Sequence, residues 1–244
     1  GEREDQGDAY HALDVIKGAS ATHSRQVVRH LAAGDKGGGL LVYCPDQTMI
    51  VADMATGGLV DLEQVHSSTI RGVAYDASKG VVATTGDDKK LVLWKFPEMK
   101  ISAQCTVDKK TVAVALDADS KHVIFAEKSG EVFRKPCSDL TAPAKHLLGH
   151  ISSLSDLAMT LDSKYVLSAD RDEKVRISHY PAAFEMEGVC LGHTEMVTCI
   201  VMAPHPGGKG EVIVTGGADG SLRVWELPSG KLLDTVQVEE GSEG

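Results

Sequence analysis

An internal repeat with a period of a little over 40 residues constrains this chain most. Short apolar segments follow turn-forming residues at regular intervals, as Leu91–Trp94 follows Asp87–Lys90 and Leu222–Trp225 follows Ala218–Ser221. These segments end at Ala52, Trp94, Arg134, Ser178 and Trp225, with spacings of 42, 40, 44 and 47 residues. Six residues before these ends stand Asp46, Asp88, Lys128, Asp172 and Asp219. Such a period indicates one small structural unit that is copied along the chain.

Each repeat is predicted to contain four short strands. In the last repeat these strands are residues 197–201, 211–215, 222–225 and 232–236, and turn residues such as Asp219-Gly220 separate them. A single four-stranded sheet cannot bury both of its faces. Stacking such sheets around an axis buries them and leaves only short edges exposed.

Gly-His pairs mark the beginning of two repeats, since Gly149-His150 and Gly192-His193 lie 43 residues apart. Gly-His early in a repeat and Trp late in it resemble the WD40 repeat. This resemblance implies an all-β fold, a WD40 β-propeller, as a single domain over residues 1–244. The five visible repeats span about residues 24–64, 65–107, 108–148, 149–191 and 192–238.

The number of blades is left open by the sequence. Propellers of this kind most often have seven blades, and five repeats are visible here. A small ring, part of a longer chain and blades without a clear sequence signal all remain open. Residues 10–16 are a candidate extra strand that would close the ring with the last blade.

His193, Thr215 and Asp219 have the residue types of a hydrolytic triad. The same types recur one repeat earlier as His150, Ser168 and Asp172, and a catalytic site is not normally repeated in every blade. The WD40 resemblance implies instead a buried hydrogen-bond network inside each blade. The residues assigned to these structural networks are His150, Asp172, His193, Thr215, Asp219, Trp225, Asp88 and Trp94.

No pattern for a metal or a cofactor was found. The ten histidines form no H-E-x-x-H motif, and Gly208-Lys209-Gly210 precedes a predicted strand rather than the helix that a phosphate-binding loop requires. The five cysteines are odd in number and show no C-x-x-C spacing. We therefore expect no catalytic residue, no metal, no cofactor and reduced cysteines.

The composition favours an intracellular protein without a membrane partner. The formal net charge is −10, so the chain is not expected to coat nucleic acid by itself. Residues 1–8 are polar and acidic, so no signal peptide is expected, and no apolar run approaches the roughly 18 residues of a membrane span.

The segment Ser168–Ser178 departs from ordinary blade sequences. Six charged residues fall within the seven positions from Asp170 to Arg176, and Ser178 replaces the usual Trp. A solvated hairpin with weak internal ion pairs is one interpretation. A charged surface that recognises a partner is the other. Lys128, Arg134 and Lys135 add a basic cluster in the preceding repeat, for which scattered surface lysines are the alternative.

With its flanks Leu148-Gly149-His150 and Cys190 to Glu195, this segment resembles the WD-repeat non-catalytic subunit of the tRNA (guanine-N7)-methyltransferase. Residues 126–132 match the same family, and the resemblance covers about residues 120–230. It implies a heterodimer with a catalytic subunit that binds S-adenosylmethionine and forms N7-methylguanosine in the tRNA variable loop. It also implies nuclear localisation, with the cytoplasm as a further location, and only indirect or weak contact with tRNA. The implied partner-binding residues are Arg176, Lys174, Asp172, Arg171 and Lys128.

The chain also departs from this family. The family is usually seven-bladed and longer, often with a basic C-terminal tail, whereas Glu239-Glu240 make the end of this sequence acidic. Any closing blades are absent from this sequence, so ring closure and contact of such a tail with RNA are left open.

Two other classes of propeller protein differ from this sequence at specific positions. A generic WD40 adaptor of a ubiquitin ligase or a chromatin complex is the alternative, but Trp94-Lys95 and Trp225-Glu226 lack the Asp and Arg that ligase adaptors often carry after this Trp. A propeller enzyme with an axial site would need polar inner strands, and residues 112–116 and 154–159 are mostly apolar.

Overall fold

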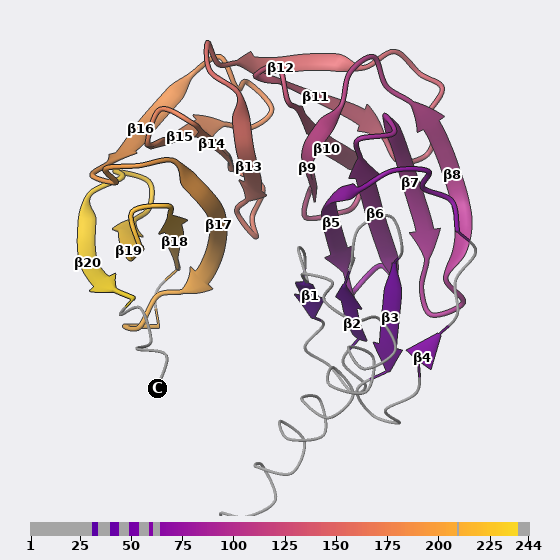
Figure 1. The fold of residues 1–244 in the computed structure, drawn as a ribbon, viewed down its shortest axis with the longest axis horizontal. Helices are drawn as coiled ribbons and strands as arrows, with labels where there is room; N and C mark the ends of the chain where they lie inside the picture. The colour runs from indigo at the N-terminus through magenta and orange to yellow at the C-terminus, as the bar shows by residue number, and fades with distance from the viewer. Residues whose placement is uncertain are drawn as a thin grey trace, which may run out of the picture. The chain divides into compact units, whose positions relative to one another are not determined.

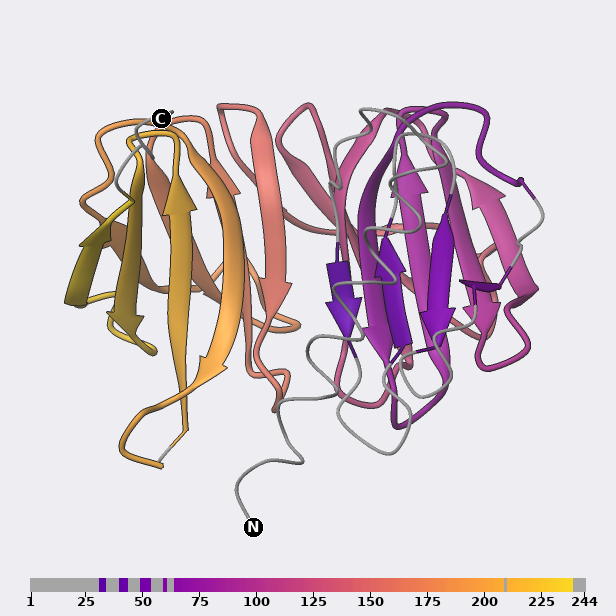
Figure 2. The ribbon, with the colours of Figure 1, turned by 60° about the horizontal axis from the view of Figure 1, so that its bottom comes forward.

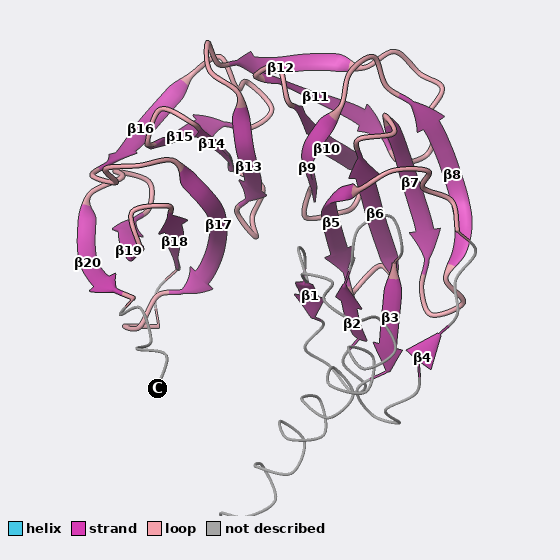
Figure 3. Cartoon of the chain, in the orientation of Figure 1, coloured by secondary structure: helices cyan, strands magenta, loops and turns pink. Residues whose placement is uncertain are grey.

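The structure is a computed structural model that describes residues 31–33, 40–43, 49–53, 59–60, 64–208 and 210–238. In this part of the chain the regular elements are all β-strands, joined by turns and loops (Figures 1 and 3). None of the described elements is a helix that could span a bilayer. The predicted closing strand at residues 10–16 lies outside the described residues.

The strands form five antiparallel sheets of four strands each. The first two sheets contain β1 (Leu31–Ala33), β2 (Leu40–Tyr43), β3 (Ile50–Asp53) and β4 (Leu59–Val60), then β5 (Ile70–Asp76), β6 (Val81–Gly86), β7 (Lys90–Lys95) and β8 (Lys100–Thr106). The third contains β9 (Thr111–Leu116), β10 (His122–Glu127), β11 (Glu131–Pro136) and β12 (Lys145–Gly149). The fourth contains β13 (Leu154–Met159), β14 (Tyr165–Asp170), β15 (Lys174–His179) and β16 (Met186–Leu191). The fifth contains β17 (Val197–Pro204), β18 (Glu211–Gly217), β19 (Ser221–Glu226) and β20 (Leu232–Gln237).

Each sheet is a meander in which every strand pairs with its neighbour in sequence, as expected for a propeller blade. Burial falls from the middle of a blade to its outer edge. All residues of β14 except Tyr165 are buried, whereas β8 alternates and every residue of β20 is exposed. Strands buried on both faces carry nearly continuous apolar residues, which explains why these segments stood out in the sequence.

The chain divides into two compact units, residues 1–107 and 108–244. The first holds β1–β8, with a core that includes Val51, Val82, Val92 and Trp94. The second holds β9–β20. Within this second unit, β13 packs against both β9 and β17, so the first strands of three successive blades lie side by side (Figures 1 and 2).

The turns between the second and third strands correct the sequence alignment of the repeats. Lys89, Gly130, Glu173 and Gly220 hold equivalent places in these turns, and all have a positive φ between 63° and 107°. Counted from this position, the third blade has Lys135 where its neighbours have Trp94, Ser178 and Trp225. The assignment of Arg134 and Lys128 to the Trp and Asp positions was therefore wrong by one residue, because the charged pair Arg134-Lys135 gave no apolar landmark.

Candidate functional site

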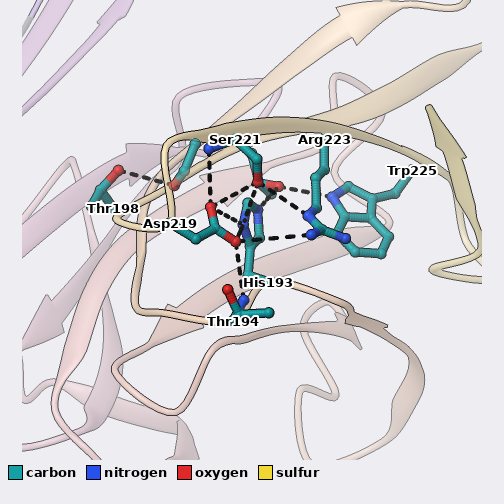
Figure 4. A network of polar contacts seen from close by, with 9 residues as sticks. His193, Thr194, Thr198, Asp219, Ser221, Arg223 and Trp225 are labelled. Carbon is teal, nitrogen blue, oxygen red and sulfur yellow. Dashed lines mark hydrogen bonds and ion pairs between the residues drawn. The ribbon is translucent and has the colours of Figure 1, made fainter. Parts of the chain in front are cut away.

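The blade β17–β20 contains a closed hydrogen-bond network around His193 (Figure 4). His193 Nδ1 lies 3.0 Å from Oδ2 of Asp219, and its Nε2 lies 2.7 Å from the hydroxyl of Thr215. Trp225 donates from Nε1 to the same hydroxyl at 2.8 Å. If Nδ1 donates to the carboxylate, the neutral imidazole has Nε2 as its acceptor, so Thr215 donates to it. The network thus joins β18 and β19 to the turn between them and to the loop that precedes β17.

The blade β5–β8 repeats this arrangement. His66 Nδ1 lies 3.0 Å from Oδ2 of Asp88, and its Nε2 lies 2.9 Å from Thr84 Oγ1. Trp94 donates to the Thr84 hydroxyl at 3.0 Å. The hydroxyls of Thr84 and Thr215 belong to residues with 0% exposure, so neither can reach a substrate as a nucleophile. The geometry is that of a structural network that satisfies buried polar groups.

The Asp219 carboxylate is held in its charged form. Burial alone would raise its pKa, but the Thr194 backbone N–H, the Ser221 hydroxyl and His193 together keep the pKa well below the usual range. The Asp219 carboxylate also accepts from the Ser221 backbone N–H at 3.0 Å, which fixes the β18–β19 turn. A charged carboxylate inside a blade is stable because several donors surround it.

In the blade β13–β16 the predicted network residue Asp172 is replaced by Asp170. His150 Nδ1 lies 2.8 Å from Asp170 Oδ2, and its Nε2 lies 2.7 Å from Ser168 Oγ. The Asp172 side chain is 55% exposed and approaches only Lys174, at 4.0 Å. The assignment of Asp172 to the blade network was therefore wrong.

The physical reason lies at the last position of the second strand. The neighbouring blade has Gly217 there, and a Cβ at Gly217 would lie 2.3 Å from His193 Nδ1. Asp170 at the equivalent place brings a carboxylate directly to the histidine, so the acid two residues later is not needed. Burial alone would raise the pKa of Asp170, but the hydrogen bonds with His150 and with the Asp172 backbone N–H lower it.

The blade β9–β12 has no such network around the Trp position. Lys135 occupies that position, is buried, and donates from Nζ to the carbonyl oxygens of Leu140 and Ala142 at 2.9 and 2.5 Å. Lys135 therefore anchors the loop before β12 and does not contribute to a basic surface. Arg134 is partly buried and lies over the ring of Tyr180, with its guanidinium carbon 5.6 Å from the ring centroid. Of the predicted basic cluster, only Lys128 is exposed.

The five predicted partner-binding residues lie at one end of two neighbouring blades. Arg171 and Asp172 are in the β14–β15 turn, and Lys174 and Arg176 follow on β15. Lys128 is in the β10–β11 turn. The loop from Gly149 to Ser153 contacts both turns, because His150 N donates to Gly130 O and Arg171 N donates to Ser153 O. Arg176 Nη1 donates to Gly149 O at 3.2 Å.

Sequence reasoning missed Ile151 in the same loop. Its side chain has a relative exposure of 102%, although it is apolar. The residues that directly follow the network histidines in the other two blades are Ser67 and Thr194, which are polar. Comparing these three positions would have singled out Ile151.

No cluster of three or more metal-ligating side chains occurs among the described residues. Cys105, Cys137, Cys190 and Cys199 are free thiols, and Cys44 lies outside the described part. Burial raises the pKa of the Cys190 thiol to about 12, which makes it unreactive at neutral pH.

Two families match this chain. Residues 134–243 match the tRNA methyltransferase TRM82 WD40 domain, and residues 60–95 match the WD domain, G-beta repeat. The first match includes the charged β14–β15 hairpin and the blade β17–β20.

Three similar proteins are each named as the tRNA (guanine-N(7)-)-methyltransferase non-catalytic subunit wdr4. The protein from Dictyostelium discoideum is 32% identical, over 80% of this chain and 46% of its own length. The Xenopus laevis protein is 33% identical, over 79% and 49%. The Homo sapiens protein is 34% identical, over 68% and 40%. The chain thus spans about half or less of the length of these relatives. The resemblance to the WD-repeat non-catalytic subunit, noted in the sequence, is confirmed by these matches.

A solved structure with a similar fold is the β-propeller domain of Cps50 (Swd1) from Myceliophteria thermophila. The structural match covers 87% of this chain and 75% of the Cps50 chain, with a TM-score of 0.70 and a sequence identity of 11%. This likeness concerns the fold alone, and it confirms the predicted β-propeller class.

Proposed function

Since residues 134–243 match the tRNA methyltransferase TRM82 WD40 domain, we propose that this chain is a non-catalytic subunit of tRNA (guanine-N7)-methyltransferase. In this role it binds and stabilises the catalytic subunit and helps it form N7-methylguanosine in the tRNA variable loop. The observation that carries the proposal is the match of this domain, together with relatives whose names state the same role.

The blade networks support a role without catalysis. The groups that resemble a hydrolytic triad are buried and bonded to one another, and they recur in separate blades. Such groups stabilise the blades rather than act on a substrate. The reaction and its S-adenosylmethionine would then belong to the partner subunit, and we expect this chain to bind no cofactor of its own.

The partner of the proposed heterodimer is the catalytic subunit. Its binding surface would include Arg176, Lys174, Asp172, Arg171 and Lys128, at adjacent turns of two blades. Exposed charges of this kind guide association and select the correct partner. The net charge of −10 favours indirect or weak contact with tRNA. By the same family relationship we propose that the protein acts in the nucleus, with the cytoplasm as a further location.

The proposal is tested by reconstitution with the purified catalytic subunit. N7-methylguanosine formation on tRNA is measured for the catalytic subunit alone, for this chain alone and for the mixture. We expect this chain alone to be inactive and the mixture to be more active or longer-lived than the catalytic subunit alone. Equal activity with and without the chain, and no co-purification, would contradict the proposal.

A charge reversal locates the interaction. Arg176→Glu places a negative charge beside the carbonyl of Gly149 and removes a cation from the proposed surface, so we expect co-purification to be strongly reduced. Lys231→Glu is the matched control, since Lys231 is exposed in the β19–β20 turn away from this hairpin. Recovery of Arg176→Glu at the wild-type yield would remove Arg176 from the interface.

A further inference from the structure

Ile151 is an apolar side chain displayed on a well-anchored loop. It lies in the loop between β12 and β13, and its side chain has a relative exposure of 102%. Its neighbours His150 and Leu154 are buried. Because Ile151 is exposed in the free chain, its side chain adds no hydrophobic stabilisation to the fold. The equivalent residues Ser67 and Thr194 are polar, as is usual in a solvent-exposed loop.

The loop from Gly149 to Ser153 is held from both sides. His150 N donates to Gly130 O at 2.9 Å, and Arg171 N donates to Ser153 O at 3.1 Å. Arg176 donates to Gly149 O, and the His150 ring is fixed below by Asp170 and Ser168. The loop also packs closely on the β10–β11 turn, since a Cβ at Gly130 would lie 2.5 Å from His150 O. Ile151 is therefore presented by a loop that loses little conformational entropy on binding.

Cationic residues occur in both of the hairpins that this loop contacts. Lys128 lies in the turn on one side, and Arg171, Lys174 and Arg176 belong to the hairpin on the other. Lys128, Arg171 and Arg176 form no ion pair with any described residue, whereas Lys174 approaches Asp172 at 4.0 Å. Acidic groups are also present, because Glu173 is exposed and Glu131 is close to His146. The cations without an acidic partner leave room for carboxylates from another molecule.

We propose that Ile151 is the apolar anchor of the surface that receives the catalytic subunit, with Lys128, Arg171 and Arg176 as its charged rim. The segment that docks there carries an apolar pocket or side chain flanked by carboxylates. This inference rests on the proposed function, and it adds an apolar contact to a surface that the sequence described only through its charges. Interfaces derive most of their affinity from such a buried centre, while the rim steers association.

The charges alone would also suit a nucleic-acid phosphate backbone. An exposed isoleucine at the centre argues against that partner, because phosphate contacts are made by cations and polar groups. Contact with tRNA is therefore an outcome that the test must separate from contact with protein.

The test compares Ile151→Ser with Leu161→Ser in the full 244-residue chain. Serine is the type of residue found after the histidine of another blade. Leu161 is also strongly exposed, at 78%, but lies in the β13–β14 turn at the opposite end of the sheet. The dissociation constant of each variant for the purified catalytic subunit is measured by calorimetry, and the melting temperature of each free variant is recorded.

We expect Ile151→Ser to weaken binding by about tenfold or more, which corresponds to about 1.4 kcal/mol. Leu161→Ser should bind as the wild type does, and both variants should melt at the wild-type temperature. Wild-type affinity of Ile151→Ser, with binding by Arg176→Glu still weakened, would overturn the anchor and leave the proposed function standing. If Ile151→Ser instead weakened the binding of tRNA to the free chain and left binding to the catalytic subunit unchanged, the anchor role of Ile151 would also be overturned. Failure of the wild-type chain to bind the catalytic subunit would overturn the proposed function itself.

Discussion

Single residues decide how the buried histidine is satisfied in the blades that contain one. Asp219 reaches His193 from the turn, and Gly217 leaves the necessary space. Asp170 reaches His150 from the end of the strand instead. Both solutions satisfy the same imidazole nitrogen, and they differ in which residue of the turn is left at the surface.

This difference predicts unequal losses of stability when Asp170 and Asp172 are each truncated. Asp170→Ala removes the partner of His150 Nδ1 and the acceptor of Asp172 N, which lies 3.0 Å from Asp170 Oδ1. We expect a loss of about 1–3 kcal/mol in the free energy of unfolding, because buried polar groups are left unpaired. Asp172→Ala removes an exposed side chain and should change this free energy by less than about 0.5 kcal/mol.

Urea denaturation of the two variants at neutral pH provides the measurement. The pair is its own control, since the same residue type is truncated two positions apart. A larger loss for Asp172→Ala than for Asp170→Ala would mean that Asp172 holds the histidine after all.

The sequence predicted the residue types of the networks but not every position. His193, Thr215, Asp219 and Trp225 were predictable because their spacing follows the repeat. Asp170 was hidden because two acids lie two residues apart, and the repeat period favoured the wrong one. The choice depends on the space at the strand end, which the order of residues does not reveal.

Between elements, Asp156 connects the first strands of two blades. It lies on β13, and its Oδ2 accepts from Ile200 N on β17 at 2.7 Å, while its Oδ1 accepts from Leu157 N at 2.8 Å. Burial raises the pKa of Asp156 to about 6, and the two backbone donors only partly oppose this effect. One carboxylate thus links neighbouring blades at an electrostatic cost near neutral pH.

The raised pKa of Asp156 predicts a pH-dependent stability. The native state binds this proton more tightly than the unfolded chain, in which the pKa of Asp is about 3.9. The stabilisation that follows is complete below about pH 4 and is lost as the pH rises through about 6. Lowering the pH from 7 to 5 should therefore stabilise the wild type relative to Asp156→Asn by roughly 1 kcal/mol.

Denaturant unfolding of both proteins at pH 5, 6 and 7 measures this difference. Histidine titration contributes to both proteins alike and cancels in the comparison. An identical pH dependence in wild type and variant would show that Asp156 does not titrate in this range.

Strand positions were more predictable than turn geometry. The apolar runs located the buried strands, because burial on both faces demands apolar residues at nearly every position. The place of Lys135 was not predictable, since its amine is satisfied by the carbonyls of Leu140 and Ala142 from a loop that no pattern connects to it. Tertiary contacts of this kind appear only when the blade is assembled.

For the molecule as a whole, the proposed role as a subunit links stability to the partner. A ligand that binds only the native state raises the free energy of unfolding, by about 2.7 kcal/mol when its free concentration is 100 times the dissociation constant. For a chain of this length we expect the melting temperature to rise by roughly 5–10 °C with the catalytic subunit. Scanning calorimetry at several partner concentrations measures this shift.

Arg176→Glu serves as the control for this experiment. Its free form should melt slightly below the wild type, because the bond to Gly149 O is lost, and the partner should raise its melting temperature by less than it raises that of the wild type. A rise that is the same for both proteins would mean that the stabilisation does not pass through the charged hairpin.

The position of Asp170 also has an evolutionary consequence. The carboxylate that bonds His150 comes from Asp170 at the end of β14. The side chains of the turn residues Arg171, Asp172 and Glu173 are therefore not needed for the hydrogen-bond network of this blade. Mutations there can accumulate without loss of folding, whereas the equivalent turn of the last blade is held by Asp219. Among relatives, this hairpin should therefore change only together with the surface of the partner subunit that it contacts. Such coevolution would be seen as paired substitutions in the two chains.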